Sequence, residues 1–154
     1  MDPSTEAIAD GRVRHPGVEF VQGVAHDLPL ASGSADLVIV SFVLHWLDRS
    51  RLLAAVAEID RVLRDGGHLL LSDFLPDAPT RVRYHHRPEV DIWTYKQDYA
   101  QPFLASGLYG EIERVVIDHR TGQPADPALD QRERGFVSVL QKDLQGRYAV
   151  GSAG

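Results

Sequence analysis

Ala35-Asp36-Leu37-Val38-Ile39-Val40-Ser41 and His68-Leu69-Leu70-Leu71-Ser72-Asp73-Phe74 are the two stretches that decide the fold. Continuous aliphatic runs of this length are typical of parallel strands buried on both faces of a sheet. Between them, apolar residues recur at helical spacing from Asp48 to Leu63, and Asp65-Gly66-Gly67 is expected to end that helix. Strand, helix and strand form a βαβ unit, whose right-handed crossover makes the two strands parallel. The sequence therefore predicts an α/β fold in which the first run is a central strand.

Weaker elements flank this unit on both sides. We expect a short helix from Ser4 to Val13 and a strand with one covered face at Val18 to Gln22. Later in the chain, the pattern predicts a helix from about Lys96 to Ser106 and two strands, Ile112 to Asp118 and Gly135 to Gln141. These elements extend the sheet, and the C-terminal strand is expected to be antiparallel.

The composition bounds the class of protein. The chain has 154 residues, 44% hydrophobic and 25% charged, which suits one domain, expected at residues 1–144 with a tail at 145–154. It has no cysteine, so neither a disulfide framework nor a thiolate metal site is expected, and we predict a cytoplasmic location. A net charge of -6 argues against a nucleic-acid partner, and no apolar stretch suits a membrane span.

Three segments carry a family resemblance. Gly17-Val18-Glu19-Phe20-Val21-Gln22-Gly23-Val24-Ala25-His26-Asp27-Leu28-Pro29-Leu30, followed by Ala35-Asp36-Leu37-Val38, resembles the middle of class I S-adenosylmethionine-dependent methyltransferases of the small-molecule type. Arg61-Val62-Leu63-Arg64-Asp65-Gly66-Gly67 is similar to that family's helix end and glycine turn before its fifth strand. The resemblance covers Asp2 to Asp73. It implies a Rossmann-like, mostly parallel sheet flanked by helices, S-adenosyl-L-methionine as cofactor, and methyl transfer to an O, N or C atom of a small molecule.

One family feature has no counterpart in this sequence. The glycine-rich turn after the family's first strand is missing, and Asp2-Pro3-Ser4 is similar to the residues after its second strand. The resemblance therefore implies a domain truncated at its N-terminus, in which the Phe20 strand lacks its usual neighbour. Either the chain is a fragment, or that strand pairs with the Val38 strand or with a second copy, giving a homodimer through an exposed sheet edge.

Ligands of open parallel sheets bind at the carboxyl ends of the strands, which selects the candidate cofactor residues. By resemblance, Asp2 matches the acid that accepts hydrogen bonds from the ribose hydroxyls. Val24 stands where the family often has an aspartate that binds the adenine amino group, and the backbone of Ala25 or His26 would meet a ring nitrogen. The residues that match the stretch beside the methionine end of the cofactor are Ser41 and Phe42.

The candidate acceptor residues follow the two aliphatic runs. By resemblance, His45-Trp46 stands where many relatives place residues near the transferring methyl group, and His45 is the candidate catalytic base because an imidazole removes protons near neutral pH, with a structural role as the alternative. The candidate substrate-binding residues are Trp46, Asp73, Tyr84, His85 and Tyr95, with local packing as the alternative. Adjacent histidines on an extended chain point in different directions, so we expect no metal site at His85-His86 or elsewhere.

Two other functional classes stay open from the sequence. A non-catalytic methyltransferase remnant would use its exposed sheet edge for self-association or partner binding. A nicotinamide-dependent oxidoreductase shares the open parallel sheet, but it too needs a glycine-rich first turn. Fold alone does not decide between such chemistries.

Overall fold

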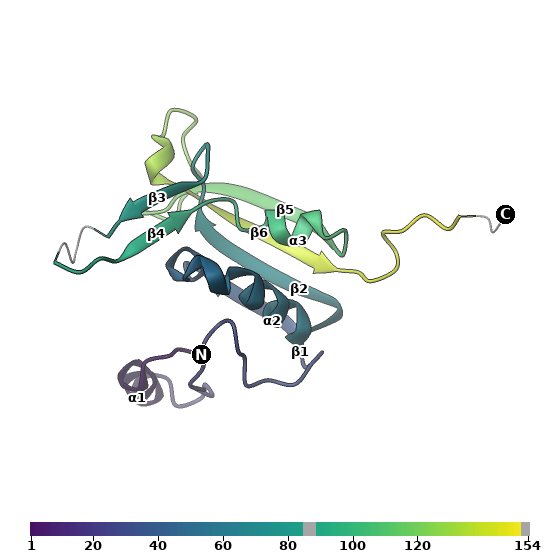
Figure 1. Ribbon diagram of the computed structural model, residues 1–154, viewed down its shortest axis with the longest axis horizontal. Helices are drawn as coiled ribbons and strands as arrows, with labels where there is room; N and C mark the ends of the chain where they lie inside the picture. Colours follow the sequence, from purple (N-terminus) through teal and green to yellow (C-terminus); the bar gives the residue numbers. More distant parts are fainter. Residues whose placement is uncertain (85–88, 152–154) are drawn as a thin grey trace.

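A computed structural model of the protein describes residues 1–84 and 89–151. Its main sheet contains four strands in the order β1, β2, β6, β5, with bounds Ala35–Ser41, Leu63–Phe74, Arg134–Lys142 and Tyr109–Asp118. β1 and β2 run parallel, whereas β6 runs antiparallel to both β2 and β5 (Figure 1). The predicted α/β class, the parallel pair and the antiparallel last strand are confirmed. In the described sheet only the pairing of β1 with β2 is parallel, so the sheet is mixed.

Helices α2 (Leu52–Val62) and α3 (Gln101–Ala105) cover one face of the sheet (Figure 1). The predicted long helix is therefore confirmed, and a 3-10 turn at Arg49–Arg51 precedes it. The core between helices and sheet includes Ala55, Ile59, Leu69, Leu71, Phe103, Phe136 and Leu140, all at most 2% exposed. Each such side chain contributes ~1.5–3 kcal/mol of burial free energy, so this layer holds the sheet together.

The end of α2 differs from the prediction. The helix ends at Val62 and β2 begins at Leu63, so the glycine turn lies inside the strand, with Gly66 at φ 72°. The side chain of Lys142, on β6, caps the C-terminus of α2 instead. Its Nζ donates to the carbonyl oxygens of Asp60 (2.8 Å) and Leu63 (3.2 Å), which satisfies backbone groups that a helix C-terminus leaves unpaired.

β1 is an edge strand of the described sheet, which corrects the prediction of a central strand buried on both faces. Val40 faces α2 and is 8% exposed, but Leu37 and Ile39, which point to the opposite face, are 52% and 61% exposed. The physical reason is that no described helix covers that face beside β1 and β2 is its only described strand neighbour.

The N-terminal segment confirms one prediction and contradicts another. Helix α1 (Thr5–Arg14) forms where expected, and the Ser4 side chain caps it by accepting from the Ala7 amide at 3.1 Å. The strand predicted at Val18 to Gln22 does not form, and this segment does not pair with β1. Gln22 makes a single parallel bridge with Asp2. Since Asp2 is the one described residue paired with this segment, a strand cannot extend along it.

A two-stranded hairpin, which we did not predict, follows the main βαβ unit. It pairs β3 (Thr80–Arg83) with β4 (Trp93–Lys96) and projects beyond the carboxyl end of β2 (Figure 1). The helix expected from Lys96 therefore begins only at Gln101. No helix in the described part of the chain has the length and apolar character to cross a bilayer.

Candidate functional site

The carboxyl ends of β1 and β2 meet in register, with Ser41 opposite Ser72. The next residue, Phe42, donates its amide to the Ser72 carbonyl at 2.8 Å and has φ 51°, a left-handed conformation that is strained for a residue other than glycine. Such strain costs about 1–3 kcal/mol and persists only where packing enforces it. Here the Phe42 ring packs edge-on against Phe74 at 5.2 Å between centroids. The turn starts the 3-10 helix η1 (Leu44–Trp46), which carries His45 over the end of β2.

His45 and Asp73 form a buried pair at this point. The His45 Nδ1 lies 2.9 Å from the Asp73 Oδ1, and the two side chains are 4% and 1% exposed. The Phe74 amide also donates to Oδ1, at 2.8 Å, whereas Oδ2 has no hydrogen-bond partner among the described residues. When Asp73 is ionised its carboxylate only accepts hydrogen bonds, so this contact places the His45 proton on Nδ1 and leaves Nε2 without one. This arrangement suits an imidazole held ready to accept a proton.

Aromatic side chains surround the pair. The His45 ring lies 4.9 Å from the Phe74 ring and 5.1 Å from the Trp46 ring. Trp46, which is 44% exposed, meets Tyr84 edge-on at 4.8 Å. The predicted residues His45, Asp73, Trp46 and Tyr84 are thus brought together. His85 lies outside the described residues, so its predicted role stays a prediction.

Arg49, which sequence reasoning missed, links η1 to the segment from Tyr95 to Tyr99. Its guanidinium lies 4.4 Å from the centroid of the Tyr95 ring and donates to the Leu44 carbonyl at 2.8 Å and to the Tyr99 hydroxyl at 2.9 Å. Burial raises the pKa of Tyr99 to about 12, so its hydroxyl keeps its proton and donates to the Tyr95 carbonyl. Tyr95 therefore contacts this bracing network, and none of its described contacts is with His45. No sequence pattern marks Arg49, since its role depends on contacts between distant segments.

The candidate cofactor residues nearer the N-terminus form a second group. The bridge between Asp2 and Gln22 brings Asp2 beside the Val24 loop, and a hollow of about 300 Å³ opens there. Pro3, Gln22, Gly23, Val24, Asp27 and Pro29 line it. The Nδ1 of His26 is buried without a partner among the described residues, and Ala25 packs against the core. Asp2, Ala25 and His26 are thus chain neighbours of residues that line the hollow, but they do not line it themselves.

Two residues of α2 hold that loop in place. Glu58 accepts from the Leu28 amide at 2.8 Å, and Arg61 donates to the carbonyls of Leu28 (3.0 Å) and Leu30 (2.8 Å). The Arg61 hydrogen bond and the Leu28 amide lower the pKa of Glu58 to about 2, so this carboxylate stays ionised. The Val24 loop is therefore fixed to the helix of the βαβ unit. Within the described residues, no hydrogen bond or ring contact joins the Asp2 group directly to the His45 group.

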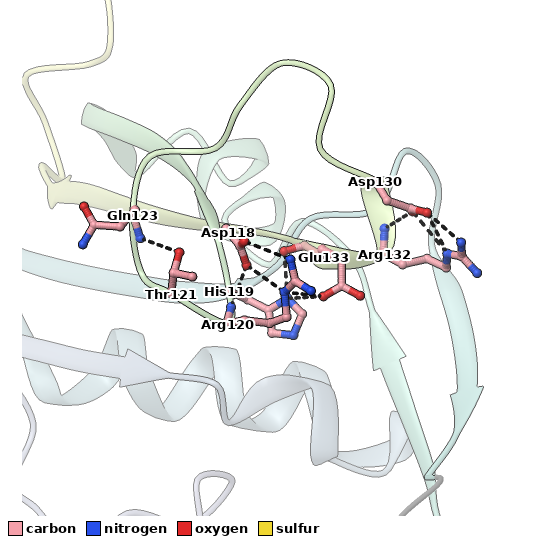
Figure 2. Close-up of polar contacts among 8 residues, drawn as sticks. All are labelled: Asp118, His119, Arg120, Thr121, Gln123, Asp130, Arg132 and Glu133. Atoms are coloured by element: carbon pink, nitrogen blue, oxygen red, sulfur yellow. Dashed lines mark hydrogen bonds and ion pairs between the residues drawn. The ribbon is translucent and has the colours of Figure 1, made fainter.

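Asp118, His119 and Glu133 place potential metal-ligand atoms within 4.8 Å of one another, although we expected no metal site. Arg120 already pairs with both carboxylates of this cluster, because its guanidinium lies 3.1 Å from an oxygen of Asp118 and 3.1 Å from one of Glu133 (Figure 2). The hydrogen bond from Arg120 also lowers the pKa of Asp118. A cation would have to displace the arginine, so the cluster is an ion-pair network.

Comparison with known proteins gives similarity to methyltransferases. Residues 1–71 match the family model described as a methyltransferase domain. The chain is 41% identical over 85 residues to a demethylmenaquinone methyltransferase of Beutenbergia cavernae, covering 54% of this chain and 35% of that one. It is 36% identical over 147 residues to a malonyl-[acyl-carrier protein] O-methyltransferase of Methylococcus capsulatus, covering 86% and 47%. The chain thus spans about a third to a half of the curated relatives it matches.

Solved structures agree in fold. A methyltransferase of Methanosarcina mazei superposes with a TM-score of 0.66 at 20% identity, covering 94% of this chain and 81% of that one. The N-methyltransferase NodS of Bradyrhizobium japonicum, solved with S-adenosyl-L-homocysteine, gives a TM-score of 0.59 at 16% identity, covering 92% and 64%. At such identities the likeness concerns the fold alone.

Proposed function

We propose that this chain, whose residues 1–71 match a methyltransferase domain, is part of a class I methyltransferase and takes part in S-adenosylmethionine-dependent methyl transfer to an oxygen, nitrogen or carbon atom of a small molecule. The observation that carries the proposal is the buried His45–Asp73 pair at the carboxyl ends of two parallel strands. Ligands of open α/β sheets bind at that end of the strands.

The residues in and beside the hollow lined by Pro3, Gln22 and Val24 fit one half of the cofactor. The carboxylate of Asp2 is exposed and accepts from the Ser4 amide through one oxygen, so the other is available to ribose hydroxyls. The backbone of Ala25 or His26 would meet a ring nitrogen of the adenine. Val24 cannot accept a hydrogen bond through its side chain, so the adenine amino group would be held without the usual acid. Ser41 and Phe42 would flank the methionine end.

The proposed role of His45 is proton removal from the acceptor. The bound cofactor would supply a methyl group on a sulfonium, and direct displacement needs the acceptor atom in line and at near contact. Nε2 of His45 is the nitrogen free to take the acceptor's proton, since Nδ1 is held by Asp73. Trp46 and Tyr84 would wall the acceptor site, and Tyr95 would support it through Arg49.

Titration calorimetry with S-adenosylhomocysteine and a labelled-methyl transfer assay over a panel of small acceptors test this function. We expect His45→Gln to retain cofactor-product binding while transfer falls by about 10²–10⁴-fold, the usual contribution of a positioned base. His68→Gln, in the middle of β2 and paired with Leu37 at the start of β1, is the matched control and should change neither. If the chain binds no S-adenosylhomocysteine at millimolar concentrations, the enzymatic proposal is wrong for this chain.

A second candidate function is self-association through the β1 edge, in a non-catalytic remnant. The observation that favours it is the exposure of Leu37 and Ile39 on a strand with a free edge. Exposed apolar strand edges promote pairing with another chain. Light scattering should then give a dimer mass that Ile39→Lys returns to the monomer, whereas a monomer over the whole concentration range rejects this candidate.

We also propose the cytoplasm as the location, on the ground that a chain without cysteine gains nothing from an oxidising compartment. Fractionation of cells expressing the protein, followed by immunoblotting, tests this. A signal confined to the membrane or secreted fraction would contradict it.

A further inference from the structure

Lys96, the last residue of β4, places a cation beside the acceptor site. Its Nζ lies 3.7 Å from the centroid of the Phe74 ring, a cation–π contact. Among the described residues, Nζ has no hydrogen bond and no carboxylate within ion-pair distance. Its three N–H donors are therefore uncommitted, although the side chain is half-buried.

The ring under Lys96 is the ring that packs against His45. Phe74 lies 4.9 Å from the His45 ring, so the ammonium and the proposed base flank one aromatic side chain. The backbone that carries Lys96 is braced, since Tyr95 stacks on Arg49 and the Thr94 hydroxyl donates to the Val82 carbonyl at 3.2 Å. The ammonium is thus held in a defined position close to the expected chemistry.

The carboxylates nearest to Lys96 are committed elsewhere. Asp73 and Glu133 act on it electrostatically, but Asp73 pairs with His45 and Glu133 pairs with Arg120. Burial is the larger effect and lowers the pKa of Lys96. A partly desolvated ammonium without a direct partner is costly, and a bound anion would recover that cost.

A small hollow, lined in part by Lys96, has the charge and size to hold an anionic group. Its volume is about 170 Å³, and Pro79, Thr80, Arg81, Tyr95, Lys96 and Gln97 line it. Two of these residues are cations and none is an acid. The volume is below the roughly 300 Å³ where pockets for drug-sized ligands begin, so it would take a small group.

We propose that Lys96 binds a carboxylate of the methyl acceptor, so that the preferred acceptors are small organic acids whose reacting atom reaches Nε2 of His45. This inference rests on the function proposed above and narrows its substrate class. Lys96 would form a charge-assisted hydrogen bond to the acid, while Trp46 and Phe74 contact the apolar part of the molecule. Neutral analogues of the same shape would bind more weakly.

Binding of benzoate, with benzamide as its neutral analogue, tests the inference without turnover. Affinity is measured by ligand-observed NMR on the whole chain. We expect wild type to prefer benzoate over benzamide, and Lys96→Met to weaken benzoate binding about 10- to 100-fold with little effect on benzamide. Lys96→Arg, which keeps the charge, should retain most of the preference and shows that the site still folds.

Arg83→Met is the matched control, because it removes one cation from the exposed face of the same hairpin. The inference is wrong if Lys96→Met binds benzoate as wild type does, if Arg83→Met loses as much, or if wild type shows no preference for benzoate. Calorimetry with S-adenosylhomocysteine is run on the same samples. If the chain binds S-adenosylhomocysteine but does not prefer benzoate, only the proposed preference for organic acids is rejected. If it prefers benzoate but does not bind S-adenosylhomocysteine, the methyltransferase proposal is rejected.

Discussion

Replacing Asp73 with asparagine should destabilise the protein while leaving its shape nearly unchanged. Asp73 is fully buried, and its Oδ1 accepts both from His45 Nδ1 and from the Phe74 amide. If the asparagine oxygen takes the place of Oδ1, its NH₂ group occupies the Oδ2 position, where no described residue offers an acceptor. If the amide is reversed, the Phe74 N–H loses its acceptor. Either orientation leaves a buried donor unpaired.

The magnitude follows from that unpaired donor. A buried polar group without a partner costs about 1–3 kcal/mol of unfolding free energy. With a urea m-value of ~2 kcal/mol/M for a domain of this size, the unfolding midpoint should fall by roughly 0.5–1.5 M. Asp36→Asn is the control, because Asp36 pairs with Arg64 at the surface, with side chains 83% and 52% exposed, and such pairs contribute ~0–1 kcal/mol.

The same variant has a spectroscopic readout. Nitrogen-15 NMR of the imidazole should show the His45 proton on Nδ1 in the wild-type protein, and a changed tautomer population in Asp73→Asn. Two outcomes together would refute the reasoning: a proton on Nε2 in wild type, and a variant as stable as wild type. They would mean that the carboxylate does not orient the imidazole, and the proposed base would lose its support.

Three further outcomes are expected. Lys142→Met should cost about 1–3 kcal/mol in urea unfolding, because it removes the donor to the carbonyls at the end of α2 and the partner of the half-buried Asp60; a loss below ~0.5 kcal/mol would contradict that role. The folded pKa of Glu58, about 2, lies below its ordinary 4.5, so its stabilising effect is complete above pH 4.5 and is lost as the pH falls towards 2. The NMR signal of the Leu28 amide should titrate with the Glu58 carboxylate near pH 2. A midpoint near pH 4.5 would show that Glu58 does not hold the Leu28 amide. Tyr99 should ionise only near pH 12 in ultraviolet titration, with stability lost as the pH rises from 10 to 12, whereas ionisation at pH 10 would place its hydroxyl in water.

The elements that sequence reasoning predicted well are those with strong local patterns. A local pattern was sufficient for the aliphatic runs around Ile39 and Leu70 and for the helical spacing between them. These segments form the parallel pair and α2. The Val18 to Gln22 strand failed because its alternation describes a strand only when another strand lies beside it, and here Asp2 alone does. The hairpin of β3 and β4 was missed because Thr80–Arg83 is short, charged and exposed.

The candidate site divides in the same way. Position at a strand end selected Asp73, the family resemblance selected His45, and the structure joins them. Lys96 and Arg49 were not selected, because their positions depend on where the hairpin folds over η1, and a tertiary contact of this kind has no sequence period. The spacing also predicted a helix at Lys96, which would have turned this side chain to a different environment.

The strand order has a consequence for synthesis on the ribosome. β6, at Arg134–Lys142, lies between β2 and β5 and is the only strand that pairs with β5 in the described sheet. Until residue 142 has left the exit tunnel, β5 has no neighbour and β2 has only one. A nascent chain should therefore expose one unpaired edge of β2 once Phe74 has emerged, and an unpaired β5 once Asp118 has emerged, until β6 covers both.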